Sequence, residues 1–141
     1  MLKGGIDVAA STTIKGLTVE IGGNTAPLEK SLGNVNKNAR SLETELRQVE
    51  KLLKLDPTNT ELLAQKQKLL AEAVDNSSKK LDTLKLAAEQ ASEKLANGEI
   101  GEDQYRALQR EIIKTEQELK KFEKAAKNTA DQVSASFERM G

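Results

Sequence analysis

The stretch KLLKLDPTNTELLAQKQKLL, residues 51–70, places leucines at helical spacing on both sides of a segment that cannot stay helical. Pro57 has no backbone N–H and moves Asp56 away from the α-helical region. Directly after it, Thr58 and Glu61 have the spacing of a capping box, which starts a helix. A stop followed at once by a start predicts two helices that fold back on each other, rather than one kinked helix.

Apolar residues before this turn recur in alternating steps of three and four, which is the spacing of a heptad seam. Thr25 is the predicted N-cap, with Pro27 in the first turn. The sequence therefore predicts a first helix over residues 25–55. Its seam consists of Leu28, Leu32, Val35, Ala39, Leu42, Leu46, Val49 and Leu53.

A second stop and start lies at residues 97–101. Gly98 predicts a left-handed C-cap, and Gly101 an N-cap followed by two acidic residues in the first turn. Helices are therefore predicted over 58–97 and 101–137. One seam row of the second helix is Leu63, Leu70, Ser77, Leu84 and Ala91, and the third helix carries Tyr105, Leu108, Ile112, Leu119 and Phe122.

These helices lead to an all-α expectation: an antiparallel three-helix coiled-coil bundle over residues 25–137. Ser77 interrupts the apolar seam of the second helix. A buried polar residue there would fix the register of the bundle. A partly exposed helix face is the favoured interpretation.

Residues 13–24 have a different pattern, since Leu17, Val19 and Ile21 alternate with polar residues as in a β-strand with one buried face. A single strand leaves its backbone groups unpaired and needs a partner. The tail at 1–12, predicted to be mobile, could supply one through Ile6 and Val8. The other source is a second protein chain.

The amino-acid composition argues against catalytic activity, against a nucleic-acid partner and against insertion into a membrane. The 141 residues include no histidine and no cysteine, which are the commonest bases, nucleophiles and metal ligands. The 22 cationic and 22 anionic side chains balance, so no nucleic-acid partner is expected, and no membrane-spanning run occurs. Asp56, Asn59 and Glu61 in the turn and the glycine pairs match neither an EF-hand nor a P-loop, and turn chemistry explains both. No catalytic, cofactor or metal residue is predicted, and the chain is not expected to be an enzyme.

The residues expected to carry function are those of the seam and the strand, acting as an interaction surface. They are Leu17, Val19, Ile21, Leu42, Leu46, Val49, Leu53, Leu63, Leu70, Leu84, Leu108, Ile112, Leu119 and Phe122.

These motifs are similar to those of two protein families. The segment DPTN also begins many tetratricopeptide repeats, but those repeats are about 34 residues long, too short for the helical stretches on either side. The segments LTVEIGGNT, KLDPTNTELLAQKQ and GEIGEDQYRALQREI together resemble the amino-terminal region of tail tape measure proteins of long-tailed phages and prophages.

That resemblance implies a structural role in the virion tail. Tape measure proteins act as a scaffold around which the tail tube assembles, so that their length sets tail length. It also implies several parallel copies in the tube lumen, tail assembly chaperones as partners, and assembly in the host cytoplasm. Full tape measure proteins are many hundreds of residues long, so this chain is expected to be a fragment, a processed piece or a truncated relative. The alternative is a generic cytosolic coiled-coil oligomerisation or adaptor module.

Overall fold

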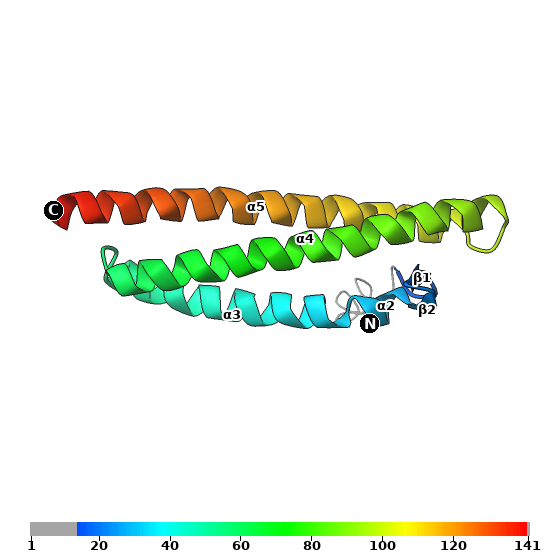
Figure 1. Ribbon diagram of the computed structural model, residues 1–141, viewed down its shortest axis with the longest axis horizontal. Coiled ribbons are helices and arrows are strands. Elements are labelled where there is room, and N and C mark those ends of the chain that lie inside the picture. The colour runs from blue at the N-terminus through cyan, green and yellow to red at the C-terminus, as the bar shows by residue number, and fades with distance from the viewer. Residues whose placement is uncertain (1–13, 141) are drawn as a thin grey trace, which may run out of the picture. The chain divides into compact units, whose positions relative to one another are not determined.

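The computed structural model describes residues 14–140, and their side chains as far as residue 135. The predicted mobile tail at 1–12 lies outside this range. In chain order the elements are β1 (Thr18–Ile21), β2 (Asn24–Pro27), α2 (Leu28–Ser31), α3 (Gly33–Leu55), α4 (Thr60–Ala96) and α5 (Glu102–Met140) (Figure 1). The fold is therefore mostly α-helical with a two-stranded sheet, and the expectation of a mostly helical chain is confirmed.

The described chain divides into two compact units. Unit 1 comprises residues 14–34 and 79–115, and unit 2 comprises residues 35–78 and 116–140. The long helices α4 and α5 each contribute one segment to both units.

The turn after α3 contains the predicted break, but its cap differs from the expectation. The Asn59 side-chain oxygen accepts a hydrogen bond of 2.9 Å from the Leu62 N–H, and the Asn59 amide donates to Asp56 at 3.1 Å. Asn59 is therefore the N-cap of α4, and the prediction of a capping box at Thr58 is wrong. Asparagine is as good an N-cap as threonine, and Asp56 holds its amide in place here.

The turn between α4 and α5 is built from the predicted glycines. Gly98 has a φ of +77°, and its N–H donates to the Leu95 carbonyl at 3.1 Å. The Glu99 N–H donates to the Lys94 carbonyl at 2.8 Å, which completes a Schellman motif. Gly101 directly precedes α5, so both glycine assignments are confirmed.

The N-terminal part of the described chain is a hairpin rather than one strand and a helix start. β1 and β2 pair antiparallel, and Thr25, the predicted N-cap, lies opposite Glu20 in the ladder. Gly22 and Gly23 both have positive φ, as a tight two-residue hairpin turn requires. The backbone of residues 24–27 thereby forms hydrogen bonds with one edge of β1. These bonds stabilise the extended conformation of Thr25 more than its N-cap preference stabilises a helix start.

The first helical stretch is consequently shorter than predicted. It begins at Leu28 instead of residue 25, and a turn at Leu32 separates α2 from α3. Gly33 follows at once, and glycine has a low helix propensity. The candidate hairpin partners Ile6 and Val8 lie outside the described residues.

The observed cap generates a test by substitution. We expect Asn59→Ala to lower the free energy of unfolding by about 1 kcal/mol, because the Leu62 N–H loses its acceptor. Thr58→Ala is the matched control and should change it by less than about 0.5 kcal/mol. Urea denaturation of both variants measures the difference, and a larger loss in Thr58→Ala would restore the capping box.

Candidate interaction surface

The hairpin and the adjoining helices form the core of unit 1. Val19, Leu28, Leu32, Leu84 and Leu108 are fully buried, and Leu17 is nearly so. Ile21 does not share this burial: it lies at the end of β1, beside the Gly22–Gly23 turn, and is 47% exposed. The expected apolar face of the strand is therefore two residues long.

Side chains of α4 bond the outer edge of β1. The Gln90 side-chain oxygen accepts from the Glu20 N–H at 2.7 Å, and its amide donates to the Glu20 carbonyl at 2.8 Å. One turn later the Lys94 ammonium donates to the carbonyl of Thr18 at 3.4 Å and also to its hydroxyl. Sequence reasoning missed both residues, since nothing local distinguishes Gln90 from other glutamines in the helix.

The core of unit 2 contains side chains from three helices. Val49 and Leu53 of α3 and Leu63 of α4 are buried together. The half-buried residues packed against them include Leu69 of α4 and Val133 of α5. This seam is thin, because few of the available side chains are bulky.

Most of the predicted interaction residues are buried. Ile112, Leu119 and Phe122 of α5 are half-buried, and Ile21 is the exposed member. The buried members are Leu17, Val19, Leu42, Leu46, Val49, Leu53, Leu63, Leu70, Leu84 and Leu108.

Three large apolar side chains that are not among the predicted interaction residues are exposed in the described part of the chain. Leu55, the last residue of α3, is 83% exposed, and Leu52 one turn earlier is 51% exposed. Ile113 of α5 is also exposed. With Ile21 they are the large apolar side chains that are exposed among the described residues, and half-buried apolar residues add to this accessible surface.

The polar interruption of α4 is buried. Ser77 and its neighbour Asn76 are both buried, so the favoured expectation of a partly exposed face at Ser77 is wrong. The Asn76 amide donates to the Val35 carbonyl of α3 at 2.8 Å. Because this bond joins two helices, it fixes their relative register in unit 2.

The other buried polar groups are also satisfied. Thr115 and Thr129 of α5 donate their hydroxyls to the carbonyls of Glu111 and Ala125, one turn earlier in their own helix. In unit 1, Lys80 of α4 and Glu111 of α5 form a largely buried ion pair of 3.3 Å. No described buried side-chain nitrogen or oxygen lacks a partner.

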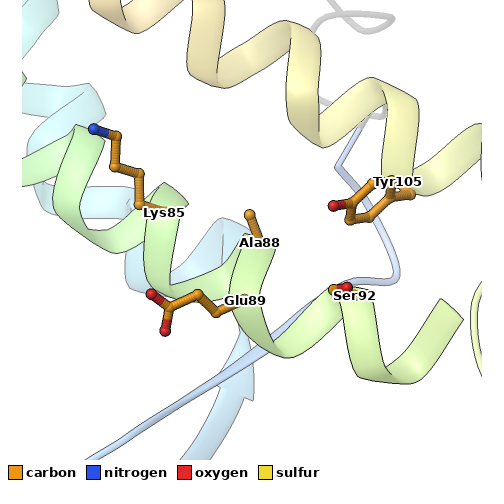
Figure 2. Close-up of a pocket in the computed structure, with 5 residues that line it drawn as sticks. All are labelled: Lys85, Ala88, Glu89, Ser92 and Tyr105. Carbon is orange, nitrogen blue, oxygen red and sulfur yellow. The ribbon is translucent and has the colours of Figure 1, made fainter. Parts of the chain in front are cut away.

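A shallow hollow lies between the segments of α4 and α5 that belong to unit 1. Lys85, Ala88, Glu89 and Ser92 of α4 line it, and Tyr105 of α5 faces them (Figure 2). A single tyrosine, one serine and an oppositely charged pair do not form the convergent polar arrangement of a catalytic site. Tyr105 is half-buried.

Among the described side chains, residues 14–135, no group of three or more Asp and Glu residues is arranged to hold a metal ion. None of the helices within residues 14–140 contains a stretch long and apolar enough to cross a membrane.

Adjacent leucines of α3 provide a test of the seam. Leu53→Ala should lower the free energy of unfolding by about 2–4 kcal/mol, because it leaves a cavity in the unit 2 core. Leu52→Ala removes the same atoms from an exposed position and should cost less than about 1 kcal/mol. Chemical denaturation compares the two, and equal losses would contradict the observed seam.

The buried amide of Asn76 provides a second test. Asn76→Ala should cost about 1–2 kcal/mol more than Asn128→Ala. Asn128 is an exposed residue of α5, so both substitutions share the gain in helix propensity and differ in the lost bond to Val35. Thermal or urea unfolding measures the difference, and two equally stable variants would show that the bond contributes nothing.

Comparison with known proteins gives two relatives. A probable tape measure protein of Lactococcus phage SK1 is 32% identical over 117 residues, which are 83% of this chain and 11% of that protein. The tape measure protein of Lactococcus phage F4-1 is 50% identical over 50 residues, which are 36% of this chain and 14% of that protein. No family model and no solved structure matches the sequence.

The matches cover a small part of either relative and, for the first, most of this chain. They agree with the resemblance found in the hairpin and turn motifs, which is thereby confirmed. Over most of its length the chain is similar to part of a probable tape measure protein of one Lactococcus phage, and over a shorter stretch to part of the tape measure protein of another.

Proposed function

We propose that the chain is a structural component of a phage tail, the N-terminal part of a tape measure protein that serves as a scaffold for tail tube assembly. The observation that carries the proposal is the 32% identity to a probable tape measure protein over 83% of the chain. The helix-rich fold supports it, because long helices give the extended reach that a length-determining scaffold needs.

We propose further that α3, α4 and α5 form one antiparallel three-helix coiled-coil domain. Within unit 2, Glu50 of α3 lies 3.6 Å from Lys66 of α4, while Val35 bonds Asn76. Later residues of α3 thus contact earlier residues of α4, as an antiparallel pair requires. Within unit 1, the ion pair between Lys80 and Glu111 is consistent with the same arrangement of α4 and α5.

The proposed partners are further copies of the chain, tail tube subunits and tail assembly chaperones. The exposed Leu52 and Leu55 and the half-buried Leu119 and Phe122 support association, since apolar groups at a helix surface are available for packing. We place the working form in the lumen of the tail tube, after synthesis in the host cytoplasm.

Small-angle X-ray scattering tests the folded-back domain. The longest helix has 39 residues, and at 1.5 Å per residue it extends about 58 Å. A folded-back monomer should therefore have a maximum dimension of about 60–70 Å. A monomer measuring well above that, towards the roughly 150 Å of three helices placed end to end, would contradict the proposed domain.

Tail length tests the scaffold role in the phage or prophage that encodes the chain. An in-frame duplication of residues 60–129 adds ten heptads, so the seam keeps its phase. We propose that the three-helix domain opens into an extended rod inside the tube, so the duplication should lengthen the tails by up to roughly 105 Å in electron micrographs, the length of about 70 residues in an α-helix. The length-neutral variant Leu52→Ala serves as the control.

Tails of unchanged length would contradict a measuring role for this region. Mass spectrometry of purified virions separates that result from failure of the structural role itself. Peptides from residues 14–140 in the virion support a tail component. Their absence from intact virions would favour the cytosolic adaptor.

A further inference from the structure

The outer edge of β1 is bonded by side chains where a sheet would normally place another strand. In an antiparallel ladder, successive residues direct their backbone groups to alternate sides. Thr18 and Glu20 direct theirs away from β2, towards α4. There the Gln90 amide bonds both the N–H and the carbonyl of Glu20, as a residue of a neighbouring strand would.

We propose that Gln90 and Lys94 form an edge cap, an intramolecular substitute for a third strand that keeps β1 from pairing with a second copy of this chain. Unpaired strand edges are templates for association between chains. The edge cap satisfies three of the four backbone groups that such pairing would use: the N–H and carbonyl of Glu20 and the carbonyl of Thr18.

The other edge of the sheet is closed by different means. β2 is four residues long and ends at Pro27, which has no N–H to donate. Pro27 and Thr25 lie opposite Thr18 and Glu20, so these are the residues whose backbone groups face outward from β2. Only Thr25 therefore presents a complete donor and acceptor pair, and β1 is the edge that requires a cap.

A second copy is the partner that best fits an uncapped β1. Two β1 strands can pair antiparallel around Val19, with Thr18 of each copy opposite Glu20 of the other. This register forms bonds with the groups that Gln90 and Lys94 now occupy, and it places no two Glu20 carboxylates opposite each other. Like charges in directly opposite positions would destabilise the pair.

Amide hydrogen exchange of the full chain measures the cap directly. In Gln90→Ala we expect the Glu20 amide to exchange roughly tenfold faster, since its only bond is lost. Gln109→Ala is the matched control: Gln109 is an exposed glutamine of α5 in the same unit. It should leave the Glu20 amide unchanged.

A variant that keeps half of the cap sharpens this measurement. Gln90→Glu retains an acceptor for the Glu20 N–H but loses the donor to its carbonyl, so its exchange rate should lie between those of the parent and Gln90→Ala. Equal rates in all variants would overturn the proposal. So would a uniform rise that includes the core amides of Leu84 and Leu108, since Gln90 would then support the whole unit rather than the edge.

Association between copies is the second readout. Sedimentation of the double variant Gln90→Ala, Lys94→Ala should show a concentration-dependent increase in mass beyond that of Gln109→Ala. Equal masses over the whole concentration range would show that the cap does not guard against a second copy. Neither result depends on the tape measure role, so the two proposals can fail separately.

Discussion

Pro57 is the constraint on which the packing of unit 2 depends. Without a stop at this position the leucines of α3 and α4 would continue along one helix, and a single helix cannot bury its own apolar stripe. The turn brings Val49 and Leu53 against Leu63, and these aliphatic side chains form a core without an aromatic residue. Asn59 then caps the start of α4, so the connection between α3 and α4 is short.

The narrow core explains how polar residues are accommodated in it. Only 2% of the residues are aromatic, and several seam positions are occupied by alanine, serine or threonine. Thr115 and Thr129 can be buried because each hydroxyl bonds a carbonyl of its own helix. The Asn76 amide instead donates a hydrogen bond to a carbonyl of α3. This bond satisfies the buried amide and also specifies which residues of the two helices lie side by side.

The sequence predicts well those features that depend on neighbouring residues. The helix breaks at Pro57 and Gly98 are confirmed, because proline and left-handed glycine act locally. The prediction that the first helix starts at Thr25 is wrong, because Thr25 pairs with Glu20 in the β-ladder and this pairing competes with its local preference for an N-cap position. The hydrogen bond between Gln90 and Glu20 joins residues that are 70 positions apart in the sequence. The periodic pattern of apolar residues does not indicate which polar side chain of a helix will bond a distant strand.

The distribution of bonds between helices also has a mechanical consequence. Asn76 and Lys80 are one turn apart on α4, and they make a hydrogen bond to α3 and an ion pair to α5, respectively. Leucine contacts are non-directional and resist sliding weakly, whereas these polar links have a defined geometry. Sliding of α3 along α4 in unit 2 therefore meets its directional resistance at Asn76 and at the Glu50–Lys66 ion pair. Sliding of α4 along α5 in unit 1 meets it at Lys80.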